Sequence, residues 1–472
     1  MTRYWRRLAF ALLLSTGFPT VVNGQAAWEY TPYQIRVWIA LDSVPQLPST
    51  LIPALGDSLT ARSSAVLGAV AQSQVAAAPA KLRGSLLNDL DGISVDAIAA
   101  AADPTDLEAD KIYFAVVTHH GGEPHIRLRE LDVRSRQLGP MIERTCGGVS
   151  GLSLALCDAI SESFTPLARI EQVDDRKFTL RLRAGGLIVD PASPAIVEPG
   201  MVLRPIVRRN DRSGQPTKGG IQAIAWSFLA VEERRASVLE CTLRSGYRSA
   251  IPAKGGVRME RLALLVRPRF DETKLVLRSR TDTSKPLANY EIHQRLPDSD
   301  ETHLVGLTDS RGSVTIYRGD GALETLVVKN GRQLLARLPL VPGYEKTVTA
   351  YVVDDDGRLA AEGFVAALYS RALDLVARRE ILAARIRARL KDGKPDEAQK
   401  LLDEFRRLDT RADLNRDLDR YRQQVATGDK VTEQRIERIF SDAQRLLLMK
   451  PLSDELLAQL TREVSAARSG GE

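Results

Sequence analysis

The chain has 472 residues, of which 44% are hydrophobic, 27% are charged and only 5% are aromatic. At roughly 150 residues per domain this length predicts about three or four domains, and the apolar content excludes wholesale disorder. The formal net charge is +6, yet acidic residues alternate with arginines along most of the chain. A protein that binds nucleic acid gathers its basic residues on one face or arm, so the composition disfavours a nucleic-acid partner.

The N-terminus predicts export. Three arginines within the first seven residues precede an apolar run at residues 8–14, and a polar stretch follows. This is the layout of a secretory signal peptide, which we place at residues 1–24. An uncleaved anchor is the alternative, although the run is shorter than the ~20 residues that span a bilayer. Without residues 1–24 the chain carries +3, and we expect it in the periplasm or outside the cell, with no transmembrane segment.

The three cysteines, Cys146, Cys157 and Cys241, do not indicate a disulfide framework, because an odd number cannot pair completely within one chain. Two interpretations stay open for the first two: a bridge between Cys146 and Cys157, or buried free thiols. The chain contains no C-x-x-C sequence, so no redox role is indicated.

Residues 25–167 predict an α/β domain. The expected elements are a strand at 33–41, helices at 55–72, 81–90 and 95–102, strands at 111–118, 126–133 and 141–146, and a helix at 149–164. The first strand alternates apolar with polar residues and then becomes wholly apolar, as a strand entering a core does. Gly121 and Gly122 separate two such strands and therefore predict a hairpin.

Residues 168–267 predict a small β-barrel or sandwich, because short strands alternate with glycine and proline turns. The expected strands lie at 170–173, 178–182, 187–189, 201–207, 222–232 and 235–244. Arginines are frequent between residues 204 and 280. We interpret them mainly as solvated strand faces, with a contact patch for an acidic surface as the alternative.

The segment from residue 262 to 353 carries a family resemblance. It contains Lys285-Pro286-Leu287-Ala288-Asn289-Tyr290-Glu291-Ile292, then Thr308-Asp309-Ser310-Arg311-Gly312-Ser313-Val314-Thr315-Ile316, then an apolar strand at 323–330. This resembles prealbumin-like or carboxypeptidase-regulatory-like β-sandwich modules. The resemblance implies a structural or adhesive module at 268–366, with no catalytic residues to transfer. Asp309 and Gly312 fit a turn, since glycine tolerates positive φ.

A second resemblance covers residues 28–267. The sequence His125-Ile126-Arg127-Leu128-Arg129-Glu130-Leu131-Asp132 and a following helix at 152–164 are similar to periplasmic accessory proteins of the flagellar-assembly T type. The resemblance implies an α/β unit followed by a small barrel.

Residues 367–472 predict a helical hairpin or bundle. The expected helices lie at 375–390, 396–408, 413–425, 433–449 and 453–467. Gly393 can end one helix and Pro395 can occupy the first turn of the next. Thr432 and Ser453 are the expected N-caps. The whole chain is thus expected to have a multidomain α+β fold: an α/β domain, a small β-barrel, an immunoglobulin- or prealbumin-like sandwich and a helical region.

A serine hydrolase site is not indicated. His119-His120-Gly121-Gly122 resembles the oxyanion loop of esterases, and Ser150 lies thirty residues later. A nucleophile elbow needs G-x-S-x-G, and the residues around Ser150 do not match it. Ser150 is better explained as a helix start.

The sequence does not indicate a metal site either. His119, His120 and His125 lie near Glu123 and Asp132, but adjacent strand residues point to opposite faces, so His119 and His120 cannot both bind one ion in a regular strand. His293 and His303 are expected to be exposed. The run Asp354-Asp355-Asp356-Gly357 lacks the spacing of an EF-hand, and we expect a hairpin turn between strands at 348–353 and 359–366. We therefore assign no catalytic, cofactor-binding or metal residues.

These observations predict an exported, non-enzymatic binding or scaffold protein that contacts other envelope proteins through its α/β and helical ends. A hydrolase of unrecognised type is the rival hypothesis, which acids gathered around His119 and His120 would favour. A cell-wall polysaccharide binder is the third, which an exposed row of Trp28, Trp38 or Trp226 would favour.

Overall fold

The structure is a computed structural model that describes residues 27–103, 105–248, 250–252, 256, 258–296, 299–425, 429–448, 452 and 454–469. The predicted signal peptide and the predicted Ser453 cap lie outside these ranges. The multidomain α+β fold is confirmed, with a barrel and a helical C-terminal region. No helix within the described ranges has the length and apolar character needed to cross a bilayer.

The chain divides into two compact units. Unit 1 comprises Met1–Thr273, Tyr317–Leu326 and Arg337–Lys346. Unit 2 comprises Lys274–Ile316, Val327–Ala336 and Thr347–Glu472. The four domain boundaries expected from the sequence stay a prediction.

Unit 1 begins with a mixed sheet in the order β2-β1-β3-β4-β5, with β6 also paired to β4. Its strands are β1 (Tyr33–Leu41), β2 (Ala71–Ala77), β3 (Lys111–His120), β4 (Glu123–Asp132), β5 (Gln137–Leu138) and β6 (Ile142–Thr145). Its helices are α2 (Leu51–Leu67), α3 (Ala80–Asn88), α4 (Val95–Ala101) and α5 (Leu152–Ser163). Strands β1, β2 and β3 run parallel, and β3 and β4 form an antiparallel hairpin.

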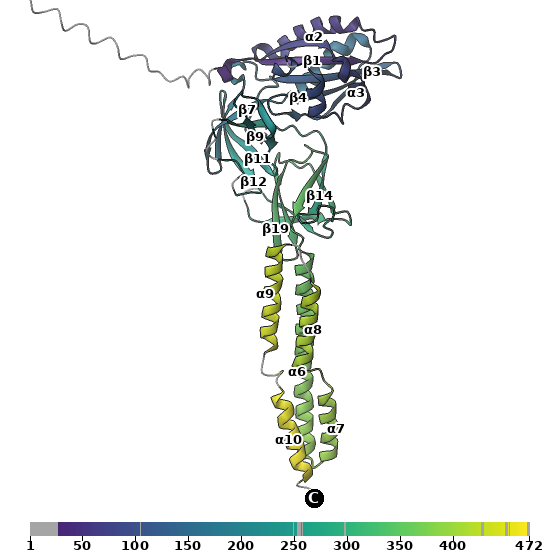
Figure 1. Cartoon of the computed structure of the whole chain (residues 1–472), viewed down its shortest axis with the longest axis vertical. Helices are drawn as coiled ribbons and strands as arrows, with labels where there is room; N and C mark the ends of the chain where they lie inside the picture. The colour runs from purple at the N-terminus through teal and green to yellow at the C-terminus, as the bar shows by residue number, and fades with distance from the viewer. Residues whose placement is uncertain are drawn as a thin grey trace, which may run out of the picture. The chain divides into compact units, whose positions relative to one another are not determined.

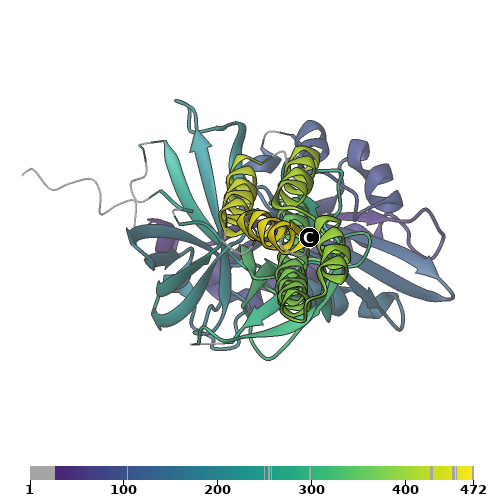
Figure 2. The ribbon, with the colours of Figure 1, turned by 90° about the horizontal axis from the view of Figure 1, so that it is seen from below.

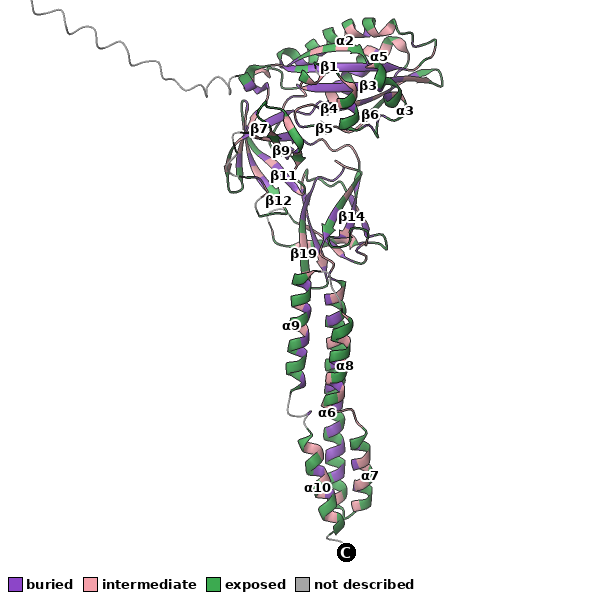
Figure 3. Cartoon of the chain, viewed as in Figure 1, coloured by how far each residue is buried: buried purple, intermediate pink, exposed green. Residues whose placement is uncertain are grey.

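Helices cover both faces of this sheet, and α2 and α3 lie on opposite sides of it (Figure 1). Odd-numbered residues of β1, such as Ile35 and Val37, pack against α2 and α5. Even-numbered residues, such as Trp38, pack against α3 and α4. A strand covered on both faces needs apolar residues at every position, which explains why β1 and β3 are buried along most of their length (Figure 3).

The sequence predicted β1 with its observed bounds and predicted the β3–β4 hairpin, which turns at Gly121 and Gly122. It placed the end of a helix at residues 71–72, where β2 in fact begins. The β2 sequence, AQSQVAA, favours a helix locally. Parallel pairing with β1 over seven residues overrides that preference.

The second part of unit 1 is a closed six-stranded barrel. Its strands are β7 (Leu167–Asp174), β8 (Lys177–Leu182), β9 (Val202–Asn210), β11 (Ser227–Arg235), β12 (Val238–Ser245) and β13 (Met259–Leu265), with β10 (Pro216–Ala223) added at the edge. The ring closes because β13 pairs with both β7 and β9. Alternate residues point inward, as in β8 and β12. The strand expected at 187–189 is absent from this barrel, and a 3₁₀ turn lies at Gly185–Leu187 instead.

Two small sheets follow. One has the order β17-β14-β20 and the other the order β16-β15-β18-β19. Their strands are β14 (Glu272–Ser279), β15 (Glu291–Arg295), β16 (Thr302–Leu307), β17 (Ser313–Tyr317), β18 (Glu324–Asn330), β19 (Gln333–Leu340) and β20 (Thr347–Val352). The predicted turn at Asp309 and Gly312 is confirmed: Gly312 has φ +75° and donates to the Asp309 carbonyl at 2.8 Å. A side chain at Gly312 would collide with the Leu277 carbonyl.

The helical region of unit 2 is built on one long helix. Its helices are α6 (Asp356–Lys391), α7 (Pro395–Arg406), α8 (Arg411–Gln424), α9 (Lys430–Leu447) and α10 (Glu455–Ser469), which Figure 2 shows close to end-on. The first half of α6 shares a core with α8 and α9, and its second half shares another with α7 and α10. Gly393 (φ +66°) and Pro395 separate α6 from α7 as predicted.

Two local predictions in this region are wrong. The strand expected at 359–366 and the hairpin turn before it are the start of α6. Asp355 forms an ion pair there with Arg358 at 2.6 Å, and both side chains are buried. The N-cap of α9 is Asp429, which accepts from the main-chain N–H of Thr432 at 3.1 Å, so Thr432 is the third residue of the helix.

Candidate functional site

The histidines singled out in the sequence lie at the tip of the β3–β4 hairpin, where His119 pairs with Pro124 and His120 with Glu123. His120 and His125 share one side of the hairpin, with ring centroids 5.9 Å apart. His119 does not line the hollow beside them. The expectation that His119 and His120 point to opposite faces therefore agrees with the pairing.

The hollow beside His120 and His125 has a volume of about 590 Å³. Its wall is mostly polar: Asp42, Asn88, Thr118, Arg127, Glu143, Arg144 and Thr145 contribute to it. His125 Nδ1 lies 3.2 Å from Thr145 Oγ1. Among the described residues, no carboxylate forms a hydrogen bond with His119, His120 or His125.

Asp132, expected near these histidines, lies at the other end of β4 and contacts Lys111. No cluster of three or more histidine, cysteine or acidic side chains within the described ranges is arranged to hold a metal ion. Asp354 and Asp356, set aside as calcium ligands, both pair with Lys285, at 2.5 and 3.1 Å.

Ser150 lies in a 3₁₀ turn immediately before α5, which agrees with its assignment as a helix start. All three cysteines are free and buried, which decides between the two open interpretations of Cys146 and Cys157. Burial raises the pKa of the Cys241 thiol to about 12, with a smaller contribution from Glu240. Such a thiol is a poor nucleophile at neutral pH.

The remaining sequence candidates are dispersed. Trp28 and Trp38 are buried at 4% and 2% exposure, and Trp226 is half-buried, so these three do not form an exposed row. His293 is half-buried and lies 2.9 Å from Glu291, contrary to the expected exposure, whereas His303 is exposed.

Unit 1 contains a buried ionic cluster that the sequence did not predict. Lys111 Nζ donates to Glu130 at 2.6 Å, to Asp132 at 3.2 Å and to the Thr165 carbonyl at 2.7 Å. All three charged side chains are at most 1% exposed. Glu130 also accepts from the Tyr113 hydroxyl at 2.8 Å and from the Thr165 main-chain N–H at 3.1 Å.

The cluster is structural, because hydrogen bonds from other buried residues surround its charges. Burial alone lowers the pKa of Lys111, but Glu130 and then Asp132 outweigh it and raise the pKa above its ordinary value. Since Thr165 leads directly into β7, the cluster joins the mixed sheet to the start of the barrel. In the sequence, Lys111 precedes an apolar run, and Glu130 and Asp132 lie two positions apart in the next strand. This spacing does not by itself predict that the three charges are buried together.

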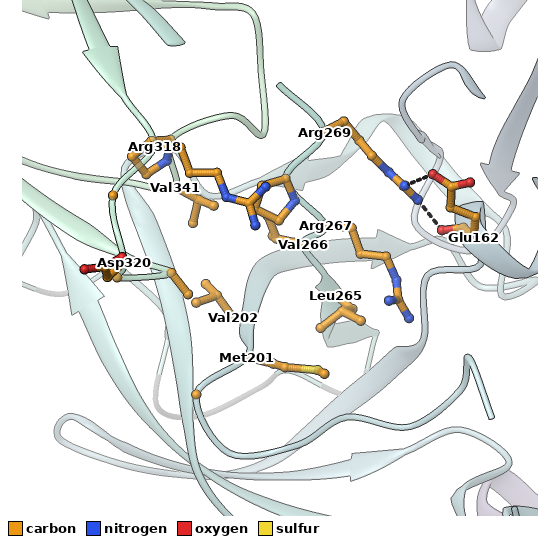
Figure 4. A pocket seen from close by; sticks show the side chains of 16 residues that line it. Glu162, Met201, Val202, Leu265, Val266, Arg267, Arg269, Arg318, Asp320 and Val341 are labelled. Atoms are coloured by element: carbon orange, nitrogen blue, oxygen red, sulfur yellow. Dashed lines mark hydrogen bonds and ion pairs between the residues drawn. The ribbon is translucent and has the colours of Figure 1, made fainter. Parts of the chain in front are cut away.

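A second cavity, of about 410 Å³, lies wholly within unit 1 (Figure 4). It is lined by Glu162, residues 200–202, 265–269 and 318–322, Val341 and Pro342. Arg267, Arg269 and Arg318 contribute three positive charges to it, and Glu162 and Asp320 two negative ones. Arg318 lies 49 residues after Arg269, so no sequence motif predicts that it shares a cavity with Arg267 and Arg269.

Arg267 and Arg269 are partly buried and form hydrogen bonds with other segments of unit 1. The prediction that the arginines of this region are solvated is therefore wrong for these two residues. Arg267 donates to the carbonyls of Phe164 at 3.1 Å and Pro194 at 2.8 Å. Burial, and then repulsion by Arg269, lowers the pKa of Arg267. Arg269 pairs with the carboxylate and carbonyl of Glu162.

In unit 2 an apolar stripe of α6 faces solvent. We call it the outer face; it consists of Ala366, Tyr369, Leu373, Ala377, Ile381, Ala384 and Ala388, all exposed. The spacing of three or four residues places these side chains on one side of a helix. Tyr369, Leu373 and Ile381 are 42%, 50% and 54% exposed.

Comparisons with known proteins assign no role to these sites. No family model matches the chain, and no curated protein matches its sequence. Among solved structures, the crystal structure of TolB from Acinetobacter baumannii is matched at 11% identity over 66% of this chain and 83% of that chain. The TM-score is 0.19, which carries no argument about fold or function.

Proposed function

We propose that the chain is an exported, non-enzymatic binding protein of the cell envelope that contacts a partner protein through the outer face of α6. One observation carries this proposal: three large apolar side chains, Tyr369, Leu373 and Ile381, are exposed along roughly three turns of a helix whose opposite side is packed. A continuous exposed apolar stripe on a soluble helix is typical of a protein–protein contact.

The charges beside the outer face indicate the chemistry of the partner. Asp374, Arg378 and Arg385 lie along one border of the stripe and Glu380 lies within it. None of the four forms an ion pair with another described residue. Small residues such as Ala377 and Ala384 let another backbone approach closely. An amphipathic helix with an apolar stripe and charges of both signs at its borders fits this surface.

The resemblances support the remaining parts of the proposal. The likeness of residues 262–353 to prealbumin-like modules supports a structural spacer. The likeness of residues 28–267 to flagellar-assembly T-type accessory proteins supports a place in the periplasm. The predicted signal peptide supports export to that compartment.

Capture from envelope extracts tests the proposal. Leu373→Glu places a charge in the middle of the outer face. Leu154→Glu is the control: it places a charge at a leucine of α5 that is 51% exposed and lies outside the outer face. We expect wild type and Leu154→Glu to capture the same protein after chemical cross-linking and Leu373→Glu to lose it. If Leu373→Glu captures the same protein at the same yield, the outer face is not the contact.

A hydrolase is the second candidate, favoured by the polar hollow that contains His120 and His125. His125 could act as a general base through its free Nε2. Turnover of ester, amide or glycoside substrates by purified protein, abolished by His125→Ala and retained by His119→Ala, would establish it. No turnover in any of these classes would leave the binding function standing.

A further inference from the structure

The cavity of unit 1 lined by Arg267, Arg269 and Arg318 is not part of the proposed contact on α6. Figure 4 shows Arg318 on one side and Arg267 and Arg269 on the other, with apolar side chains between them and the Arg269 guanidinium turned toward Glu162. The cavity contains no cysteine, histidine, serine or threonine among its lining residues. Its ionisable lining residues are the three arginines, Glu162, which pairs with Arg269, and Asp320.

Positive charge in this cavity is only partly compensated. Arg267 is held by two main-chain carbonyls and pairs with no carboxylate among the described residues. Arg269 is paired through its terminal nitrogens, but its Nε is buried without a partner. Arg318 is exposed, and its side chain forms no hydrogen bond with the described residues. The lining as a whole carries one net positive charge.

The loop at residues 318–322 adds further donors. Its sequence is Arg-Gly-Asp-Gly-Ala, and both glycines line the cavity. The main-chain N–H groups of Gly319, Asp320, Gly321 and Ala322 donate no hydrogen bond to another described residue. Exposed peptide N–H groups beside guanidinium groups favour an anion.

The rest of the wall is apolar and fixed in place. Val202, Val266 and Val341 are at most 6% exposed and belong to one core cluster with Phe228. Leu265 and Met201 extend this apolar part of the wall. A volume of about 410 Å³ holds roughly 13 atoms of the size of a water molecule.

From this geometry we infer that the cavity binds an organic monoanion: a carboxylate on a short apolar framework. A single negative charge neutralises the net charge of the lining, whereas a dianion would exceed it. The carboxylate accepts from Arg318 and from the main-chain N–H groups of the 318–322 loop, and the apolar framework lies against Val202, Val266 and Val341. Two sources share this chemistry: a free aliphatic acid and the C-terminus of an apolar peptide.

Isothermal titration of the full chain tests the inference, with octanoate as the probe and 1-octanol and octylammonium as charge controls. We expect octanoate to bind at least about tenfold more tightly than either control, because charge-assisted hydrogen bonds distinguish the anion. Equal affinity for octanoate and octanol would overturn the inference, as would absence of octanoate binding.

Two variants of the cavity and one control variant test whether octanoate binds there. Arg318→Gln removes an exposed charge that has no partner in the described chain and should weaken octanoate binding about tenfold. Arg212→Gln removes an equally exposed, unpaired arginine from the barrel hairpin and should change nothing. Ala322→Phe should block the apolar part without altering charge. Equal effects of Arg318→Gln and Arg212→Gln would show that octanoate binds elsewhere.

A third arm separates the two sources. Acetyl-Ala-Leu-Val with a free carboxylate is compared with its C-terminal amide and with octanoate. Tighter binding of the peptide acid than of octanoate assigns the site to a chain terminus, and the reverse assigns it to a free acid. Binding of the amide as tight as that of the peptide acid would contradict recognition of a carboxylate.

Discussion

The buried charges of the mixed sheet in unit 1 contrast with the charges of the long helix of unit 2, which are exposed apart from Arg358 and Arg379. In the sheet, Lys111, Glu130 and Asp132 are removed from water and surrounded by hydrogen bonds. Along α6, charged side chains such as Arg371 and Arg387 pair at the surface, where both partners are about one third or more exposed. A buried pair is costly to break because it leaves an uncompensated charge, while an exposed pair contributes little.

The most sensitive positions are therefore expected to differ. In unit 1 the largest effect is expected at a buried charge, and in unit 2 at an apolar side chain of α6. The two units can be followed separately by spectroscopy. The tryptophans that the structure describes, at positions 28, 38 and 226, belong to unit 1, and helicity at 222 nm is dominated by α6 to α10.

The largest effect is expected from Lys111→Met. It leaves Glu130 and Asp132 buried without their cation, and we expect unit 1 to lose about 3–5 kcal/mol of its free energy of unfolding. Urea unfolding followed by tryptophan fluorescence measures this loss. Lys177→Met, at an exposed lysine of β8, is the control and should change the free energy by less than about 0.5 kcal/mol. Equal effects would mean that the buried cluster is not stabilising.

The second largest effect is expected from Leu375→Ala in α6, which should lower the free energy of unfolding of unit 2 by about 3 kcal/mol. Leu375 is 5% exposed and belongs to the core shared with α8 and α9, whereas Leu373, two residues earlier, is 50% exposed. Leu373→Ala should therefore cost less than about 0.5 kcal/mol. Urea unfolding followed at 222 nm compares the two. A similar loss for both would mean that the outer face is covered within the folded chain.

Alkaline pH should reduce the difference in the free energy of unfolding between wild type and Lys111→Met. The pKa of Lys111 is raised in the folded protein, so the stability it contributes is complete below the unfolded pKa of about 10.4 and declines above it. At one pH unit above that value the difference should be smaller by about 1.4 kcal/mol. A difference that stays constant from pH 8 to 11 would contradict a raised pKa.

The smallest effect is expected at the start of α8. Thr410 accepts from the main-chain N–H of Asp413 at 3.2 Å, and Asp413 accepts in return from the Thr410 main-chain N–H at 3.0 Å. Thr410→Ala should cost about 1 kcal/mol, because it removes a helix cap. Ser441→Ala, at an exposed position within α9, should stay within about 0.5 kcal/mol. A thermal melt at 222 nm measures both.

Local chemistry was enough to predict several elements. Gly121 and Gly122 specified the hairpin, and Gly393 with Pro395 specified the break between α6 and α7. In contrast, β2 and the first turns of α6 were mispredicted. Both errors arose where a neighbour far along the chain decides the outcome: β1 pairs with β2, and Arg358 at the start of α6 donates to the Asn330 carbonyl of β18.

The candidate sites divide in the same way. Strand alternation predicted that His119 and His120 would separate, but only the pairing across the hairpin brought His120 beside His125. The arginine-lined cavity could not be predicted, because its walls come from residues 162 to 342.

By itself, the order of residues determined the fold class, the hairpins and most helix boundaries, because these depend on side-chain period and on glycine and proline within a few positions. Only the tertiary structure decided which charged residues are buried, where the barrel closes and which arginines share a cavity. Those outcomes depend on desolvation and on contacts between residues from 19 to 107 positions apart, and neither can be read from a local stretch of the chain.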